Sequence, residues 1–224
     1  MAIHEKSFRQ AVAERRATSN FESTPVPMED LKEILRLALE APSGYNLQPW
    51  RFVVVRDLEQ RKRLRAASFG QPKVEEAPVV IVACGDPLGW KDNDLEQMIS
   101  LAKERGMVND EVAKTIRKNV SSFLESAPGD AGGVTPDFGL WANRQTMIAL
   151  TTMMWAAETL GYDTAPMEGF AESKVREVLG IPERVRVVAL LAIGHRKGED
   201  KKYGGRFPIS QVCFDDQWGK GLKL

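Results

Sequence analysis

Two valine-rich stretches, Val79 to Cys84 and Val185 to Ile193, place the strongest constraint on the fold of this chain. A strand with one face in water alternates apolar and polar side chains, because successive side chains point to opposite faces. Neither stretch alternates, which is typical of strands covered on both faces. Phe52 to Val55 is a third short β-branched run. The sequence therefore predicts a sheet with structure packed against each face.

Helical patterns lie around these runs. Pro27 opens a helix whose acidic first turn suits the positive end of the helix dipole. A basic helix is expected over Leu58 to Ala67, and a longer one, apolar on most sides, over about Asp137 to Leu160. The longer one is expected to be the central buried helix. A shorter helix, Ser173 to Leu179, ends at Gly180, a typical capping glycine.

Two further segments complete the predicted domain. The region from about Leu95 to Ser126 is interpreted as a helical excursion, because apolar residues recur in it at helical spacing. The tail after His195 is polar, yet it carries apolar anchors such as Phe207 and Trp218, so it is expected to pack on another surface. The chain shows no repeat, low-complexity tract or interdomain linker, and residues 1–224 are interpreted as a single α+β domain.

Composition excludes several classes of protein. The chain has 31 basic and 31 acidic side chains, so its formal net charge does not fit a dedicated binder of nucleic acid or anionic membrane. Its longest apolar run, Val187 to Ile193, is far shorter than the roughly 20 residues of a membrane-spanning helix. Glu5 and Lys6 interrupt the stretch that a secretory signal would need. We expect a cytoplasmic protein with no nucleic-acid and no membrane partner.

Several kinds of active site are excluded by what the sequence lacks. It has no G-x-x-x-x-G-K-[ST] phosphate loop, no G-x-G-x-x-G turn and no G-x-S-x-G nucleophile elbow. Its 2 cysteines and 2 histidines are too few for a disulfide framework, a four-cysteine zinc site or a histidine-based metal site. We therefore expect no metal, and chemistry supplied by an organic cofactor.

Three segments are richer in special residues than packing requires. Arg15 and Arg16 could grip a phosphate with paired guanidinium groups, although such a pair is more often only solvated. The segment Ala41 to Trp50 offers hydroxyl and amide groups and then an indole, a combination that can line a planar heterocycle. In Ala165 to Phe170, Gly169 lets a backbone N–H approach a ligand closely. Ordinary loop chemistry explains the last two segments equally well.

Taken in order, these segments resemble the FMN-dependent nitroreductase family. The resemblance rests on Arg15-Arg16, on Ala41-Pro-Ser-Gly-Tyr-Asn-Leu-Gln-Pro-Trp50-Arg-Phe52 and on Pro166-Met-Glu-Gly-Phe170, and it extends from about Ser7 to Pro208. It implies a three-layer α+β fold with a central mixed sheet flanked by helices, and a domain-swapped homodimer with two FMN sites at the subunit interface. It also implies ping-pong electron transfer from NADH or NADPH. Noncovalent FMN is expected, because no cysteine or histidine lies in the three segments.

For the cofactor phosphate, the resemblance implies Arg15 and Arg16, joined by Arg206. The chain departs from a serine and two basic residues common in the family at Ala17, Ser19 and Gly204. Phosphate affinity is therefore expected to be lower, unless Lys201 or Lys202 supplies a charge.

For the flavin itself, the resemblance implies two further sets of residues. Those expected along the ribityl chain, the pyrimidine edge and the side of the flavin are Ser43, Asn46, Gln48 and Gln145. Those expected at one ring face and at the N5 and O4 edge are Pro166, Met167, Glu168 and Gly169. Gln71 and Lys73 match a segment that places a cation near N1 and O2, where it would stabilise the charge of the reduced ring. Lys73, Glu168 and Gly169 are the candidate catalytic residues.

The two outlying segments receive roles of their own. The excursion over about 95–126 is predicted to form a lid, with Phe123 facing the substrate; the alternative is that Phe123 lies on the core side of its helix. The tail over about 196–224 is predicted to be an exchange arm that wraps the partner subunit.

Three functions remain open at this point. The first is an NAD(P)H-dependent reductase that acts on a small-molecule acceptor, a nitroaromatic or a quinone. The second is other chemistry on the same fold, such as reductive dehalogenation or breakdown of the flavin. The third is a flavin-binding or storage protein with little turnover. Steady NAD(P)H turnover with a nitroaromatic would separate the first from the others.

Overall fold

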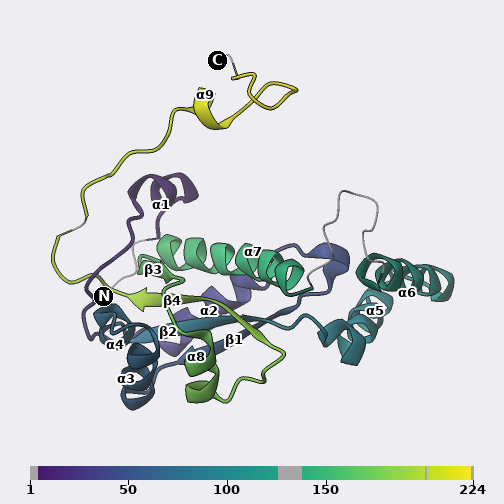
Figure 1. Ribbon diagram of the computed structural model, residues 1–224, viewed down its shortest axis with the longest axis horizontal. Coiled ribbons are helices and arrows are strands. Elements are labelled where there is room, and N and C mark those ends of the chain that lie inside the picture. The colour runs from purple at the N-terminus through teal and green to yellow at the C-terminus, as the bar shows by residue number, and fades with distance from the viewer. Residues whose placement is uncertain (1–4, 126–137, 200, 223–224) are drawn as a thin grey trace.

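The computed structural model describes residues 5–125, 138–199 and 201–222, and its helices and sheet form three layers (Figure 1). In chain order the elements are α1 (Phe8–Glu14), α2 (Met28–Ala38), η1 (Gly44–Asn46), β1 (Trp50–Val55), α3 (Leu58–Ala67), α4 (Pro72–Glu76), β2 (Val79–Gly85), η2 (Trp90–Asp94), α5 (Leu95–Glu104), α6 (Asp110–Glu125), α7 (Phe138–Thr159), β3 (Asp163–Met167), α8 (Glu172–Leu179), β4 (Arg186–Gly194) and α9 (Ile209–Val212). Helices α2 and α7 cover one face of the sheet, and α3, α4 and α8 cover the other. The predicted three-layer α+β class is confirmed.

The sheet has the strand order β1-β2-β4-β3. Its described strands all pair antiparallel, so the expectation of a mixed sheet is wrong for these strands. The reason lies in the connections. Val55 at the end of β1 pairs with Val80 near the start of β2, so the second strand begins at the end of the sheet where the first one stops and runs back beside it. A parallel contact survives only as an isolated bridge between Ala17 and Thr164 within the described residues.

Strand β2 shows why valine-rich runs without alternation belong in the middle layer. All its residues are buried. Val80 and Val82 pack with α3, α4 and α8, whereas Ile81 and Ala83 pack with α2 and α7. Each face of the strand is therefore sealed by a separate apolar cluster. The same holds for β4, whose Leu190 and Leu191 lie in opposite clusters.

The predicted helices form close to their expected bounds. Helix α7 buries Leu150 and Met153 against the sheet and is the central helix that its apolar sequence indicates. Helix α8 ends at Gly180, which adopts the left-handed conformation with φ of 66°. That conformation is easily reached only without a Cβ, which is why glycine caps the helix.

Helices α5 and α6 form a separate unit at one end of α7 (Figure 1). Leu95 and Ile99 of α5 pack with Val120 and Leu124 of α6, and Leu47 joins them from the loop before β1. The described part of the region expected as a helical excursion consists of α5 and α6; residue 126 lies outside the described residues. Through Leu47, this unit rests directly on one of the three segments singled out from the sequence.

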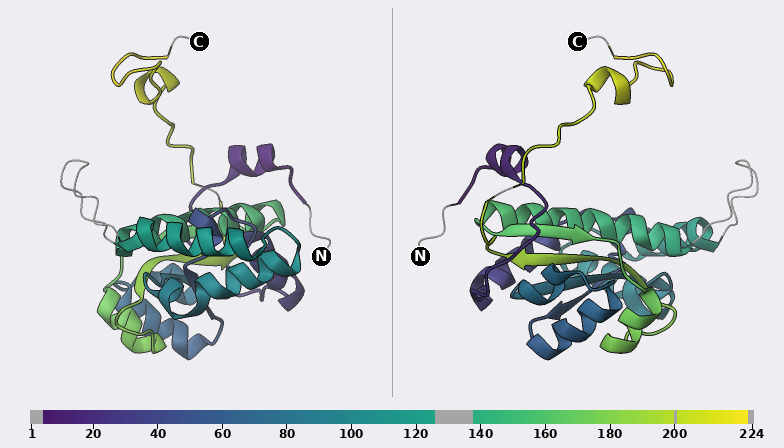
Figure 2. Two further views of the ribbon diagram at one scale, coloured as in Figure 1. Left: turned by 90° about the vertical axis from the view of Figure 1, so that its right-hand side faces the viewer. Right: turned by 60° about the vertical axis from the view of Figure 1, so that its left-hand side comes forward.

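The tail after β4 leaves the body of the chain and extends past α1 (Figure 2). Its short helix α9 is followed by an isolated bridge between Phe214 and Gly221. Its aromatic side chains stay in solvent, with Phe207 72% and Trp218 91% exposed. The predicted exchange arm thus presents apolar surface away from its own domain; its positions 200 and 223–224 are outside the described residues. None of the described helices combines the length and apolarity that a membrane crossing requires.

Candidate active site

The end of α1 presents Arg15 and Arg16 as a pair. Ser7 starts the helix with a capping box closed by Gln10, and Arg15 is the C-terminal cap. The Arg16 guanidinium donates through Nη1 to the carbonyl oxygens of Ala13, at 2.9 Å, and of Arg15, at 2.8 Å. Arg16 is therefore folded back onto its own helix, with its guanidinium plane available to a neighbour.

That neighbour is Tyr203 of the arm. The Arg16 guanidinium lies 4.6 Å from the centre of the Tyr203 ring, and the Arg206 guanidinium lies 5.6 Å from it. Both distances fall within the range of cation–π attraction. The exposed ring of Tyr203 thus lies beside both Arg16, which follows α1, and Arg206, which belongs to the arm. The family resemblance predicts that these two residues bind the same phosphate.

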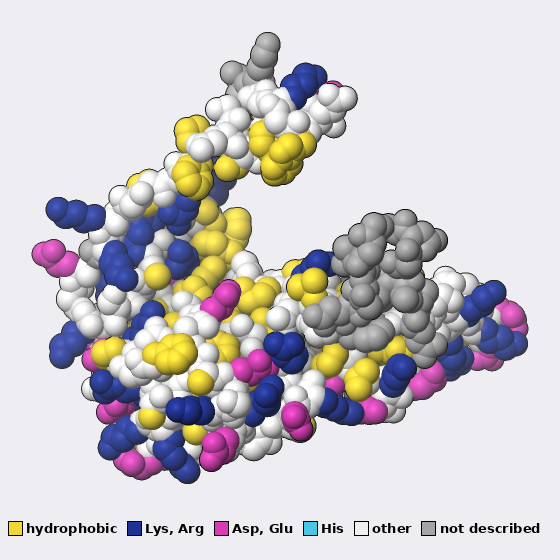
Figure 3. Space-filling model, in the orientation of Figure 1, with side chains coloured by type: hydrophobic (Ala, Val, Ile, Leu, Met, Phe, Trp, Pro, Cys, Tyr) yellow, Lys and Arg dark blue, Asp and Glu magenta, His cyan; other side chains and the backbone are white. Residues whose placement is uncertain are grey.

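Two adjoining cavities open beside this tyrosine. Their volumes are about 390 and 580 Å³. The residues that line both are Ala13, Arg15, Arg16 and Tyr203. Arg206 and Trp155 line the larger cavity, and Lys201 lines the smaller one. The space-filling view shows the corresponding hollow between arm and body, where Lys and Arg side chains meet apolar surface (Figure 3).

Arg15 has an unused hydrogen-bonding capacity at this place. Its guanidinium lies 5.8 Å from the centre of the Trp155 ring. Its Nη1 is buried, yet within the described part of the chain it meets no hydrogen-bond acceptor. An unsatisfied buried donor costs about 1–3 kcal/mol, so such an atom signals a missing partner. An anionic oxygen in the adjoining cavity would satisfy it.

Glu158 closes the back of the smaller cavity. It belongs to the last turn of α7 and is only 3% exposed. Burial raises the pKa of its carboxyl group to about 7, although the hydroxyl of Thr164, which donates to Oε1 at 2.7 Å, acts against the shift. A carboxyl group that titrates near neutral pH therefore lies among the cations of this cavity.

Gln71 and Gly169 meet on the side of the sheet that α4 covers. Gln71 Nε2 donates to the carbonyl oxygen of Gly169 at 2.7 Å. A Cβ at position 169 would lie 3.3 Å from that Nε2, so glycine permits the approach. Lys73 lies on α4, and its pKa is lowered, chiefly by burial and secondly by the positive charge of Lys201. Lys201 also lines the smaller of the two cavities.

The loop before β1 is strained and tightly tied. Tyr45, Asn46 and Gln48 have positive φ values of 53°, 55° and 46°, a conformation that side chains other than glycine rarely adopt. Gln48 N–H donates to Ser43 Oγ at 3.0 Å, and Gly44 N–H donates to Gln145 Oε1 at 2.8 Å. Strain held in this way is common where a protein shapes a binding site.

Phe123 faces outward over this loop. It is 52% exposed, and its ring centre lies 5.7 Å from that of Tyr45, whereas its neighbours Val120 and Leu124 are buried. The alternative that Phe123 lies on the core side of α6 is therefore wrong. Exposed aromatic rings from α6 and from the loop before β1 are therefore in contact at this point.

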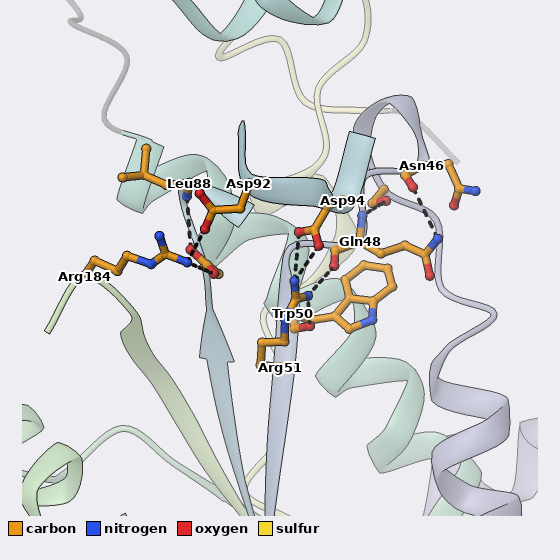
Figure 4. Close-up of polar contacts among 10 residues, drawn as sticks. Asn46, Gln48, Trp50, Arg51, Leu88, Asp92, Asp94 and Arg184 are labelled. Carbon is orange, nitrogen blue, oxygen red and sulfur yellow. Dashed lines mark hydrogen bonds and ion pairs between the residues drawn. The ribbon is translucent and has the colours of Figure 1, made fainter. Parts of the chain in front are cut away.

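Ion pairs connect the η2 segment before α5 to β1 and to the turn before β4 (Figure 4). Arg51 of β1 donates from Nη2 to both oxygens of Asp94, at 2.7 and 2.8 Å. Arg184 reaches Asp92 at 2.5 Å and Asp86 at 3.2 Å. The start of α5 is thus held by ion pairs from two sides.

Within one chain, the predicted site residues fall into two groups. Arg15, Arg16 and Arg206 gather near the carboxyl end of α7. Ser43, Gln48 and Gln145 gather nearer its amino end. Trp155, beside the first group, follows Gln145 by ten positions, which is about 15 Å along a helix.

The segment after β3 contributes mainly backbone. Pro166 is exposed on β3, which is an edge strand, where proline is tolerated. Glu168 and Gly169 are exposed directly after the strand. Met167 points the other way and is 5% exposed in the core beneath α3 and α8, so only its backbone remains available to a ligand.

Sequence reasoning missed several residues of this site: Tyr45, Trp155, Glu158, Thr164 and Tyr203. Glu158 had a readable signal, because it is the one charged residue in the carboxyl-terminal half of α7. The aromatic residues gave none, because their roles depend on partners from distant segments. In the described part of the chain, no group of three His, Cys, Asp or Glu side chains is arranged to hold a metal ion.

Comparison with known proteins gives a consistent picture. A model of the nitroreductase family matches residues 12–195. The chain is 35% identical to a Thermus thermophilus protein named NADH dehydrogenase, over 92% of this chain and 94% of that protein. It is 31% identical to Bacillus subtilis MhqN, provisionally named an NAD(P)H nitroreductase, over 91% of this chain and 96% of the relative.

Solved structures agree with the sequence comparisons. A protein from Exiguobacterium sibiricum, solved in complex with FMN, is 27% identical with a TM-score of 0.79, covering 93% of this chain and 96% of that one. Bacillus subtilis ydfN, provisionally described as a nitroreductase, is 30% identical with a TM-score of 0.82, covering 92% of this chain and 96% of that one.

Proposed function

The chain belongs to the nitroreductase family, and on this premise we propose that it is an FMN-dependent oxidoreductase that passes electrons from NAD(P)H to nitroaromatics or quinones by a ping-pong mechanism. The observation that carries the proposal is the convergence of Arg16 and Arg206 on the Tyr203 ring, beside a cavity where a buried Arg15 nitrogen lacks an acceptor among the described residues. A phosphate monoester supplies the missing acceptor and the complementary charge.

The residues present fit FMN. When bound, FMN would supply a reversible two-electron acceptor, which is the chemistry that the protein side chains lack. The three arginines would hold its phosphate, and Lys201 supports the assignment as an added cation on the same wall, partly replacing the one absent at Gly204. Attachment would be noncovalent, since Cys84 is buried in the core and Cys213 is on the arm.

Lys73 and Gln71 would act at the flavin ring. A half-buried lysine is a stronger electrostatic partner than an exposed one, because water screens it less. Its positive charge would stabilise negative charge that develops on the ring during reduction. Gln71, which holds the Gly169 carbonyl, would fix the backbone after Pro166 against the ring edge.

The separation of the two residue groups along α7 supports a homodimeric site. In a symmetric dimer, Ser43, Asn46, Gln48 and Gln145 of one chain could complete a site whose phosphate end is supplied by the other chain. The exposed aromatic side chains of the arm supply apolar surface for such a contact. The small-molecule acceptor would enter beneath the lid, beside Phe123.

The test follows the flavin spectrum anaerobically as NADH or NADPH is added, and then after a nitroaromatic or a quinone is added. Bleaching followed by recovery of the oxidised spectrum is expected. FMN that binds but does not turn over would indicate a storage protein instead. Loss of a halide from an aryl halide, or breakdown of the flavin itself, would indicate other chemistry on this fold.

Lys73→Ala refines the test. It should retain FMN and slow reduction by NAD(P)H about hundredfold, the usual effect of removing one preorganised partner of developing charge. Lys62→Ala is a matched control, because Lys62 is a surface lysine paired with Glu59 at 2.7 Å. Equal rates for both variants would remove Lys73 from the catalytic assignment.

A further inference from the structure

Glu158 occupies a place where a carboxylate is poorly stabilised. It is almost fully buried at the carboxyl end of α7, where the helix dipole is negative. Asp163 adds a like charge on the same cavity wall. Thr164, itself fully buried, donates its hydroxyl hydrogen to Glu158 and opposes these effects. Burial prevails and raises the pKa of Glu158 to about 7.

The charged and titratable groups that line the cavity with Glu158 come from three parts of the chain. The region of α1 supplies Lys6, Glu14, Arg15 and Arg16. Strand β3 supplies Asp163, and the segment after β4 supplies Arg196, Lys201 and Tyr203. Lys6 is paired with Glu14 at 3.0 Å, and Arg196 lies 4.0 Å from Asp163.

Arg15 is the cation that connects Glu158 to the proposed phosphate. Its charge favours the ionised form of Glu158, so the two groups interact through the cavity. Its buried Nη1 makes no hydrogen bond to any described residue, Glu158 included. A phosphate that binds Arg15 would therefore enter the field of a carboxyl group already present at the back of the site.

We infer that Glu158 is a further residue of the phosphate site, and that it competes with the FMN phosphate for the charge of Arg15. When Glu158 is a neutral acid, the full positive charge of Arg15 is available to the phosphate. When Glu158 is a carboxylate, it offsets the charge of Arg15 and repels the phosphate. This inference rests on the proposed function. By linkage, bound FMN must favour the protonated form of Glu158 by the same factor, so binding takes up protons near pH 7.

The experiment measures the Kd of the FMN-free protein for FMN and for riboflavin, which lacks the phosphate, by flavin fluorescence at pH 6.5, 7.5 and 8.5. The range lies above the second phosphate pKa of about 6, whose ionisation would strengthen binding with rising pH. We expect FMN binding to weaken about sixfold over the range, the effect of raising the pKa of Glu158 by one unit from about 7 when FMN binds. Riboflavin binding should not change.

Two variants locate the effect. Glu158→Gln should bind FMN as tightly at pH 8.5 as at 6.5. Glu14→Gln, a change of another carboxylate that lines the same cavity but is exposed, should keep the wild-type slope. A pH-independent Kd in the wild type, the wild-type slope in Glu158→Gln, or an equal slope for riboflavin would each overturn the inference.

A measurement on the wild type covers the case in which Glu158→Gln does not fold. Calorimetry of FMN binding at pH 7.5 in two buffers with different heats of ionisation gives the number of protons taken up. Net uptake is expected, and none would overturn the inference. Failure of the FMN assignment looks different, because the wild type would then bind no FMN at any pH. Failure of the proposed reaction would show only in the turnover test and would leave the pH dependence of FMN binding unchanged.

Discussion

Replacing Tyr203 with alanine should weaken FMN binding about tenfold while leaving the fold intact. Tyr203 is 58% exposed, so its removal opens no cavity in the core. What it removes is the ring between the guanidinium groups of Arg16 and Arg206. Arg16 remains tied to α1 by its two carbonyl contacts. Arg206 is held locally only by the Gly205 carbonyl among the described contacts, so the arm loses its alignment with α1.

The magnitude follows from the two ring contacts. A cation–π contact at an exposed site is worth about 0.5–1 kcal/mol, and both centroid distances, 4.6 and 5.6 Å, lie within the effective range. Losing both therefore costs about 1–2 kcal/mol, or a factor of roughly 5 to 30 in Kd. Tyr203→Phe keeps the ring and should stay within about twofold of the wild type.

The assay is a fluorescence titration of FMN-free protein with FMN and with riboflavin. The effect of Tyr203→Ala should be confined to FMN, because the two arginines address the phosphate. Wild-type FMN affinity in Tyr203→Ala, or an equal loss in Tyr203→Phe, would refute the role of the ring. An equal loss for riboflavin would show that the tyrosine contacts the flavin rather than organising the phosphate site.

Three further outcomes are expected. The pKa of Glu158 rises from 4.5 to about 7 in the folded chain, so its bound proton stabilises the folded state fully below about pH 4.5. This stabilisation is lost as pH rises through 7, and the free energy of unfolding then falls by about 3 kcal/mol. Urea unfolding of FMN-free protein from pH 5 to 8.5 should show this fall, and Glu158→Gln should lack it. One thiol, Cys213, should react with a thiol reagent in the native protein and two after denaturation, because burial raises the pKa of Cys84 to about 12; two fast thiols in the native state would contradict the buried position of Cys84. Asp94→Asn should speed amide hydrogen exchange in α5 and α6 about fivefold, since it weakens a half-exposed bidentate pair with Arg51 worth about 1 kcal/mol; unchanged exchange would show that apolar packing alone holds the lid.

Long and strongly patterned elements were predictable from the sequence. Strands β2 and β4 and helices α2, α3 and α7 lie within a few residues of their expected bounds. Each carries its signal locally, in an unbroken apolar run or in a helical repeat. Strand β3 was not predicted from the sequence: it has five residues and contains Pro166. Its edge position in the sheet makes that proline acceptable, and edge position is not written in the sequence.

Short elements were harder to find. Helix α4 also has five residues, too few to show a helical repeat, although Pro72 at its first position is a readable start signal. Lys73 therefore lies, half-buried, on a helix that was not predicted from the sequence.

The sequence by itself determined the family, the layered fold and the residue types that a phosphate and a flavin would require. These features are local, because a motif or an apolar pattern is formed by residues close together in the sequence and does not depend on the path of the rest of the chain. Only the tertiary structure decided which of those residues meet. It set Tyr203 between Arg16 and Arg206, left a nitrogen of Arg15 without an acceptor, and turned Met167 into the core. It also buried Glu158 at the end of α7. Charge interactions, ring contacts and burial all depend on distances in space. For segments far apart in the sequence, those distances are set only when the chain folds.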